Sequence, residues 1–189
     1  MASKKILRDI FLAKRMFLSD SEYHSRNKKL KENLARFIAF EKYNYLHTFL
    51  SIAAKKEVLT APIIELAKSQ NPQIKVLITK TLPESQLAHF LLEHNTIIET
   101  NKWGIPEPVN ATPFSHEKVD LILIPLISFD RSGHRIGYGK GYYDRFLKSV
   151  PNAKKIGLSL GPPLDLIPFS DEMDVKLDAC FTPFATYSF

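Results

Sequence analysis

Apolar side chains recur at helical spacing in the first forty residues of the chain. This periodicity predicts an amphipathic helix over residues 4–18. Ser19, followed three positions later by Glu22, is a capping-box signature, so a second helix is expected to begin there. The predicted buried stripe of that helix consists of Tyr23, Leu30, Leu34, Phe37 and Ile38.

After residue 44 the pattern changes to short apolar runs that alternate with amphipathic segments. Buried strands are expected over residues 45–53, 75–79, 120–125, 155–160 and 179–182. Helices are expected over residues 62–69 and 141–150, whereas residues 87–93 fit either a strand or a helix. Strands that are apolar on both faces and alternate with helices predict an α/β fold, with a mostly parallel central sheet and helices on both faces.

Length and charge refine this picture. A chain of 189 residues with 44% hydrophobic and 24% charged residues is expected to form a single compact domain, residues 1–189. Residues 1–60 hold 13 basic and 6 acidic side chains, and the remainder is nearly neutral. We therefore expect residues 1–43 to form a basic helical part packed on the α/β core, and the protein to bind an anionic partner.

Cysteine usage and hydropathy exclude several classes of protein. Cys180 is the only cysteine in the sequence, so neither an intrachain disulfide nor a cysteine-based zinc site is expected. No stretch approaches 18 apolar residues, and no apolar segment of signal-peptide length follows the charged start. These features predict no membrane contact and a cytoplasmic location.

The strongest chemical signal lies between the expected strand at 120–125 and the expected helix at 141–150. Gly137, Gly139 and Gly141 alternate there, and Arg135 and Lys140 add two cations. Glycines let a backbone approach a ligand closely, and a helix N-terminus offers unpaired N–H groups to an anion. The spacing matches neither the nucleotide P-loop nor the dinucleotide fingerprint. A phosphate site and a glycine-rich hairpin with incidental charge are both consistent with these residues.

The segment RIGYGKGYYDRFL, residues 135–147, resembles the signature of the 5-formyltetrahydrofolate cyclo-ligase family, also called 5,10-methenyltetrahydrofolate synthetases. That signature runs approximately G-x-R-L-G-x-G-x-G-Y-Y-D-x-x-L, and Ile136 stands where leucine is usual. The matching positions are Gly133, Arg135, Gly137, Gly139, Gly141, Tyr142, Tyr143, Asp144 and Leu147.

Further segments resemble the family in the expected order, so the resemblance covers most of the chain. They are Lys4, Lys5 and Arg8; Leu50, Ser51, Glu57 and Thr60; residues 103–108 (WGIPEP); and Asp171, Asp174 and Asp178. Two departures occur. Residues 125–129 (PLISF) replace the usual P-G-x-A-F turn. The segment before Glu57, residues 53–56, is slightly longer than the corresponding segment in many members of the family.

The resemblance implies a three-layer fold like that of sugar-phosphate isomerases and CoA-transferases. It also implies an activity, the ATP-dependent conversion of 5-formyltetrahydrofolate to 5,10-methenyltetrahydrofolate with release of ADP and phosphate. Such a cyclo-ligase forms a C–N bond through a phosphorylated formyl intermediate and uses Mg²⁺. The implied partner is a small folate, and the protein is expected to be a monomer. Separately from the resemblance, the basic residues Lys28 and Lys29 suggest a hypothesis, that the glutamate tail of a polyglutamylated folate recruits them.

The resemblance also implies roles for individual residues. Arg135, Lys140 and Tyr143 are the expected catalytic residues, and Asp144 and Asp178 are the expected magnesium ligands. The expected ATP site comprises Lys4, Lys5, Arg8, Arg135, Gly137, Tyr138, Gly139, Lys140, Gly141, Tyr142 and Tyr143. The expected folate site comprises Leu50, Glu57, Trp103, Tyr138, Gly139, Lys140, Gly141 and Tyr142.

Plainer interpretations accompany these assignments. Asp144 could simply interact favourably with the dipole of its helix, and Asp178 could cap a loop or the end of a strand. Trp103 could be an anchor for packing. At the level of function, the basic N-terminal third could bind nucleic acid, or the glycine loop could hold another anion in a related sugar-phosphate or acyl-group enzyme. The six histidines are scattered along the chain, so we expect no metal site from them.

Overall fold

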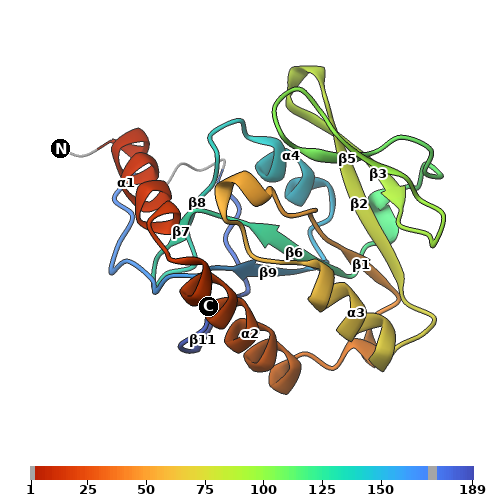
Figure 1. Ribbon diagram of the computed structural model, residues 1–189. Coiled ribbons are helices and arrows are strands. Elements are labelled where there is room, and N and C mark those ends of the chain that lie inside the picture. The colour runs from red at the N-terminus through yellow and green to blue at the C-terminus, as the bar shows by residue number, and fades with distance from the viewer. Residues whose placement is uncertain (1–2, 170–173) are drawn as a thin grey trace.

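The centre of the fold is a seven-stranded sheet in the order β11-β10-β9-β6-β1-β2-β3 (Figure 1). The computed structural model describes residues 3–169 and 174–189. Neighbouring strands from β10 to β2 run parallel, and the edge strands β3 and β11 are antiparallel to their neighbours. The strands are β1 Tyr45–His47, β2 Lys75–Leu82, β3 Gln86–Leu91, β6 Leu121–Pro125, β9 Lys154–Leu158, β10 Ala179–Phe181 and β11 Thr186–Ser188. The expected mostly parallel sheet is confirmed.

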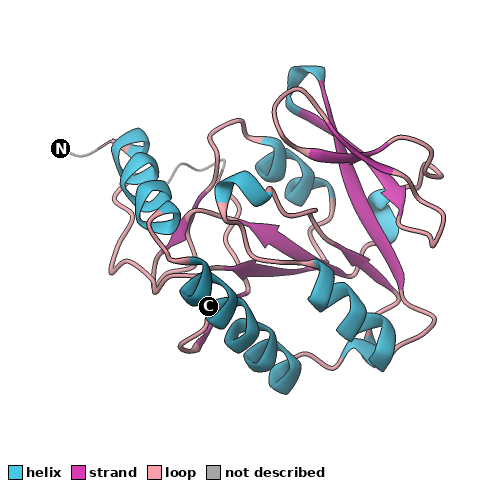
Figure 2. Cartoon of the chain, in the orientation of Figure 1, coloured by secondary structure: helices cyan, strands magenta, loops and turns pink. Residues whose placement is uncertain are grey.

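Helices cover both faces of this sheet, which gives three layers (Figure 2). α2 (Asp20–Phe37) and α3 (Ala61–Gln70) pack on one face, where Leu34 and Leu121 belong to the same buried cluster. α4 (Tyr142–Ser149) packs on the other, where Leu147 and Ile122 belong to a second buried cluster. The strands are buried on both sides because their residues alternate between these two clusters.

α1 (Lys4–Met16) packs beside the hairpin of β7 (Ser128–Phe129) and β8 (Arg135–Ile136). Its partly buried Leu7, Phe11 and Leu12 contact a small cluster of Ile127, Ile136 and Ile167. The side chain of Ser3 caps this helix by accepting from the amide of Ile6, and that of Ser19 caps α2 by accepting from Glu22. The expected start of the second helix is thus confirmed.

Two features, one in a helix and one in the first strand, differ from expectation. Phe37 is 65% exposed because α2 ends there and its ring lies over Phe181 at the surface. The expected strand over residues 45–53 is only three residues long. Beyond it the chain turns out of the sheet, since the hydroxyls of Ser51 and Thr60 donate to backbone carbonyls within this loop.

The region from residue 83 to 118 carries two hairpins. Residues 87–91 of the ambiguous segment lie in β3, which pairs with β2 across the short helix η3 (Pro83–Ser85). β4 (Ile98–Thr100) and β5 (Pro106–Pro108) form a hairpin that the sequence pattern did not predict. The buried Glu107 ties it to β2, because its carboxylate accepts hydrogen bonds from the amide and hydroxyl of Thr81.

The short helices η1 (Phe40–Lys42), η2 (Ala53–Lys55) and η4 (His116–Lys118) complete the fold. Among the residues described, no helix is both long and apolar enough to cross a membrane.

Candidate active site

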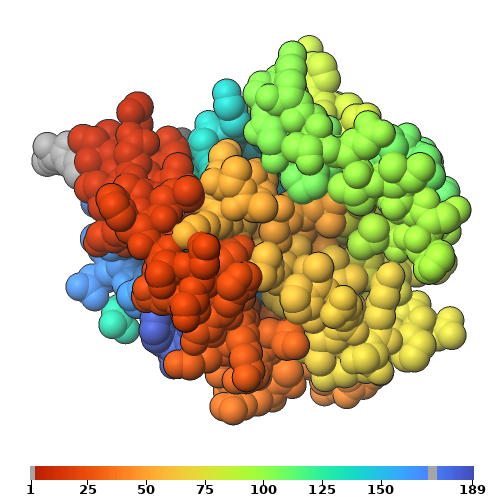
Figure 3. Space-filling model, viewed as in Figure 1, coloured from red at the N-terminus to blue at the C-terminus, as the bar shows by residue number. Residues whose placement is uncertain are grey.

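A pocket of about 970 Å³ lies where the loops leave the carboxyl ends of the parallel strands. Its walls come from α1, the loop after β1, the β2–β3 and β4–β5 hairpins and the glycine-rich loop before α4. In Figure 3 the N-terminal helix (red) and the hairpins (green) form two flanks of the visible face, with the loop after β1 (orange) between them. Ligands of open α/β sheets bind at this end of the strands.

The glycine-rich loop presents backbone to the pocket. Gly139 and Gly141 have φ angles of 85° and 70°, in the left-handed region that glycine adopts at low cost. A side chain at Gly139 would also place its Cβ 2.7 Å from the guanidinium of Arg8. Gly141 is the N-cap of α4 and offers no side-chain cap, so the first-turn N–H groups remain available to an anion. The geometry therefore supports the expected phosphate site.

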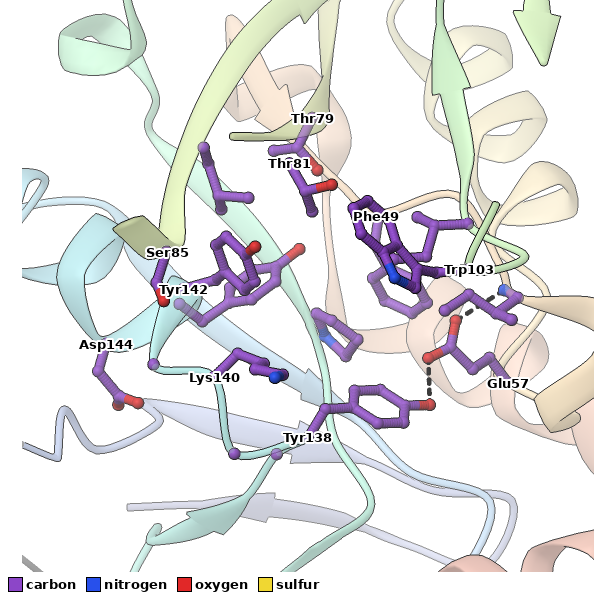
Figure 4. Close-up of a pocket in the computed structure, with 18 of the residues that line it drawn as sticks. Phe49, Glu57, Thr79, Thr81, Ser85, Trp103, Tyr138, Lys140, Tyr142 and Asp144 are labelled. Carbon is purple, nitrogen blue, oxygen red and sulfur yellow. Dashed lines mark hydrogen bonds between the residues drawn. The ribbon is translucent and has the colours of Figure 1, made fainter. Parts of the chain in front are cut away.

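Two cations of this loop differ in their surroundings. Lys140 is exposed on the pocket wall, and its ammonium makes no hydrogen bond or ion pair within the part of the chain that the structure describes (Figure 4). The guanidinium of Arg135 is only 6% exposed and donates to Asp144 and to the backbone carbonyl of Val175. Lys140 is therefore free to follow a ligand, whereas Arg135 is held in place.

The three N-terminal cations all have partners but differ in whether they reach the pocket. Arg8 donates through Nε to the carbonyl of Gly137 over 2.8 Å, and Lys4 pairs with Asp174 over 2.6 Å; both line the pocket. Lys5 is 79% exposed, pairs with Asp9 on its own helix and does not line the pocket. The structure thus brings two of the three expected residues to the site.

Glu57 lies at the other end of the pocket and is 3% exposed. One carboxylate oxygen accepts from the amide of Ile52 over 2.7 Å, and the other accepts from the hydroxyl of Tyr138 (Figure 4). Trp103, from the β4–β5 hairpin, is 64% exposed and lines the same end together with Leu50. A buried carboxylate among apolar and aromatic surfaces suits a flat ring that bears N–H donors.

The tyrosine pair at the start of α4 faces two directions. Tyr142 reaches across the pocket, and its hydroxyl donates to the carbonyl of Leu82 over 3.4 Å. Tyr143 packs on His47 and Phe146, and its buried hydroxyl has no hydrogen-bond partner in the described residues. Burial raises the pKa of Tyr143, as does the negative charge of Glu57, so this hydroxyl keeps its proton and is a donor without an acceptor.

The carboxylates expected to hold magnesium are not gathered in one place. Asp144 and Asp174 line the pocket, each beside a cation, whereas Asp178 does not line it. Asp178 instead accepts from the amide of Lys155 over 2.6 Å and so links the start of β9 to the segment before β10. Asp171 lies outside the described residues. Among the rest, no group of three or more potential ligands could hold a metal ion by itself.

Mg²⁺ usually keeps several waters and takes one or two carboxylates together with substrate phosphates. Asp144 and Asp174 provide that number of carboxylates in the pocket that the glycine-rich loop also lines. The donor set therefore fits a magnesium ion that arrives with a nucleotide, not one held in a cage built by the protein.

Three of the six histidines are clustered, in contrast to the scattered arrangement expected. The rings of His47, His89 and His116 surround Phe146 of α4, with centroid distances of 4.5, 4.6 and 5.6 Å to it. Burial and the neighbouring imidazoles lower the pKa of His47 well below its usual range and that of His89 to about 4. The position of His47 within the apolar run of a buried strand was the signal available in the sequence.

Sequence reasoning missed several residues around the site. Arg15 is buried in α1 and contacts Tyr138, and Lys55 lies over the ring of Tyr138 at 4.4 Å. Leu7, Phe11 and Arg15 are spaced four residues apart, so they lie on one face of the helix. That spacing is the signal by which Arg15 could have been found.

Fold and pocket together define an α/β enzyme in which a glycine-rich loop and a buried carboxylate line the same pocket. A model of the 5-formyltetrahydrofolate cyclo-ligase family matches residues 1–183. The chain belongs to this family and is an enzyme of the cyclo-ligase class, which indicates 5-formyltetrahydrofolate cyclo-ligase activity.

Relatives and solved structures agree with this assignment. The 5-formyltetrahydrofolate cyclo-ligase of Mycoplasma pneumoniae is 29% identical over 178 residues, which are 93% of this chain and 95% of the relative. A probable 5-formyltetrahydrofolate cyclo-ligase of Schizosaccharomyces pombe is 33% identical over 68% of this chain and 70% of its own. The structure of Aquifex aeolicus 5,10-methenyltetrahydrofolate synthetase superposes with a TM-score of 0.82 at 27% identity, covering 98% of this chain and 92% of that one.

Proposed function

We propose that the protein converts 5-formyltetrahydrofolate and ATP into 5,10-methenyltetrahydrofolate, ADP and phosphate. The observation that supports this most is a single pocket with a phosphate-binding loop at one end and Glu57 at the other. ATP would lie along the glycine-rich loop with Lys4, Arg8 and Lys140. The folate would lie toward Glu57, Leu50 and Trp103.

The first step transfers a phosphoryl group. The formyl oxygen attacks the γ-phosphorus of ATP, the bond to the β-phosphate oxygen breaks, and ADP leaves. An amide oxygen is a poor leaving group, and phosphorylation converts it into a good one. Lys140 and the N–H groups at the start of α4 would stabilise the charge that spreads over the transferring group.

The second step closes the ring. The N10 amine attacks the activated formyl carbon and loses its proton, and phosphate departs with the former formyl oxygen to leave the methenyl bridge. Placing N10 against this carbon is a matter of orientation, to which a fixed Glu57 and the surface of Tyr142 would contribute. The buried hydroxyl of Tyr143, a donor without an acceptor, could supply a hydrogen bond to the reacting oxygen.

Magnesium would neutralise the phosphates of bound ATP. Asp144 would hold it, and we propose Asp174 as a second ligand in place of the expected Asp178, because Asp174 lines the pocket and Asp178 does not. We further propose that the enzyme acts as a monomer in the cytoplasm, and that polyglutamylated folates are substrates.

The decisive experiment is ADP release by purified protein with ATP and magnesium, in the presence and absence of 5-formyltetrahydrofolate. ADP release that depends on the folate, together with the near-ultraviolet absorbance of the methenyl product, is the expected result. ADP release that ignores the folate, or no release at all, would rule the proposal out.

A further inference from the structure

α1 buries a cation where a surface helix normally buries apolar side chains. Arg15 is the only residue of this helix with a buried side chain, at 9% exposed. A buried guanidinium is costly unless its N–H groups are bonded. One terminal nitrogen donates to the carbonyl of Leu126 over 3.2 Å, and the other donates to the hydroxyl of Tyr138 over 2.6 Å. Only Nε lacks a partner among the described residues.

The second contact determines what the hydroxyl of Tyr138 can do. A phenol has one proton to donate and lone pairs with which to accept, whereas a guanidinium can only donate. Tyr138 must therefore accept from Arg15, and its own proton goes to the carboxylate of Glu57. Burial and the charge of Glu57 raise the pKa of Tyr138, so the hydroxyl keeps this proton.

The chain of contacts ends on a carboxylate that is itself fixed. Glu57 takes a hydrogen bond from Tyr138 on one oxygen and from the amide of Ile52 on the other, which sets the plane of the carboxylate. Its backbone carbonyl accepts from the hydroxyl of Tyr23 over 2.6 Å. Each carboxylate oxygen retains acceptor capacity for a ligand.

We propose that Arg15 is a positioning residue that acts through Tyr138 to fix the Glu57 carboxylate for the paired N–H donors of the substrate's pterin ring. The inference rests on the proposed function, because it takes the ligand of Glu57 to be a folate. Arg15 lies on α1 and does not line the pocket, so its effect on the ligand is indirect. The same helix carries Lys4 and Arg8, so α1 would serve both ends of the pocket.

A double-mutant cycle tests the proposal. Wild type, Arg15→Met, Tyr138→Phe and the double variant are titrated calorimetrically with 5-formyltetrahydrofolate in the absence of nucleotide. Each single change should weaken binding about tenfold, the value of one hydrogen bond that orders a charged group. The double variant should bind no more weakly than the weaker single variant, because both changes break the same chain of contacts.

Kinetics supply a second readout. In Arg15→Met the KM for 5-formyltetrahydrofolate should rise, while kcat and the KM for ATP stay near those of wild type. Lys14→Met is the matched control, because it removes the same charge from the neighbouring position, where Lys14 is exposed and lies over the ring of Phe11. This control should bind folate as wild type does.

The outcomes separate the two proposals. If wild type does not bind the folate, the proposed function fails. If wild type binds but Arg15→Met does too, or if the two losses multiply in the double variant, the positioning role is overturned. Should Arg15→Met not fold, Arg15→Lys replaces it in the cycle, with an expected loss of about threefold and the same requirement that the losses do not multiply.

Discussion

At the scale of single residues, the site separates groups that are held from groups that are free to move. Arg135 is locked between Asp144 and a backbone carbonyl, and Glu57 is locked between Tyr138 and an amide. Lys140 has no such partner in the described chain and is exposed on the pocket wall. Preorganised groups stabilise a transition state without reorganisation, while a flexible cation can follow the phosphate that is transferred.

Replacement of Lys140 by alanine tests this division. We expect kcat to fall about 100-fold, the scale of losing one charge-stabilising donor, because no other unpaired cation projects from this loop in the described structure. The thermal midpoint should stay within about 2 °C of wild type, since the side chain packs on nothing that the fold needs. Lys28→Ala, an exposed lysine on α2, is the control; full activity in Lys140→Ala would show that the role given to this residue is wrong.

Gly139 permits a second test at this scale. Gly139→Ala should lower the free energy of unfolding by about 1–2 kcal/mol, the cost of a left-handed backbone at a residue with a Cβ. It should also raise the KM for ATP, because the new methyl group displaces Arg8. Denaturant melts and ATP titrations check both effects. Gly161→Ala is the matched control, since that glycine has no positive φ and its Cβ would meet nothing within 4 Å.

Residues that lie in a recognisable motif could be assigned to the site from the sequence. Residues that are identified only by their buried position in the fold could not. Gly139, Lys140 and Glu57 lie in recognisable segments, and all three line the pocket. Asp178 matches a motif as well, yet the structure uses it to bond a backbone amide, because a pattern does not say which way a side chain points. Arg15 belongs to no motif that the sequence pattern singled out, and only its place on the core-facing side of α1, with Leu7 and Phe11, reveals it.

At the scale of elements, α4 joins the site to the core. Its first turn carries Tyr142, Tyr143 and Asp144 into the pocket, and Phe146 on its inner face is surrounded by the histidine rings of β1, β3 and η4. The elements with strong periodicity were predicted from sequence. The β4–β5 hairpin was not, because its three-residue strands are too short to show a period and Glu107 fixes them from another part of the chain.

The histidine cluster predicts how stability depends on pH. Because His89 has a pKa of about 4 in the fold and about 6.5 when unfolded, the unfolded chain binds more protons between these values. Stability should therefore decrease as the pH falls through this window. From pH 7 to pH 5 we expect a loss of about 2 kcal/mol from His89 alone.

Urea melts at pH 7 and pH 5 measure this loss. His89→Phe should lose less stability over that interval than wild type, because the titrating ring is gone while an aromatic surface remains against Phe146. His24→Gln, at an exposed position on α2, should behave as wild type. Equal losses in His89→Phe and wild type would contradict the assignment of the pH dependence to this cluster.

At the scale of the whole molecule, the walls of the pocket come from segments that are distant from one another in the sequence. α1 forms one wall, and the β2–β3 and β4–β5 hairpins form the opposite one (Figures 1 and 3). The layers of the α/β core followed from apolar periodicity, whereas the anionic partner predicted from the net charge of the N-terminal third stays a prediction. Much of that charge lies away from the pocket, since Lys28 and Lys29 are exposed on α2 and do not line it.

Ligand binding should therefore stabilise α1 selectively. If opening of this helix releases ATP, amide hydrogen exchange in residues 4–16 should slow about 100-fold at an ATP–magnesium concentration 100 times its Kd. Exchange in α3, which does not line the pocket, should change little through local opening. Unchanged exchange in α1 under saturating ATP would show that the helix is not part of the nucleotide site.

The exposed edge of the pocket also gives the protein an optical reporter. Trp103 is the only tryptophan in the sequence, and its ring lies at the surface with the ammonium of Lys102 at 4.6 Å. The emission of the free protein should therefore be that of a solvated indole. A ligand that stacks on the ring would shift this emission to shorter wavelength, while a ligand confined to the glycine-rich loop would leave it unchanged. One intrinsic signal could thus distinguish occupation of the two ends of the pocket without any label.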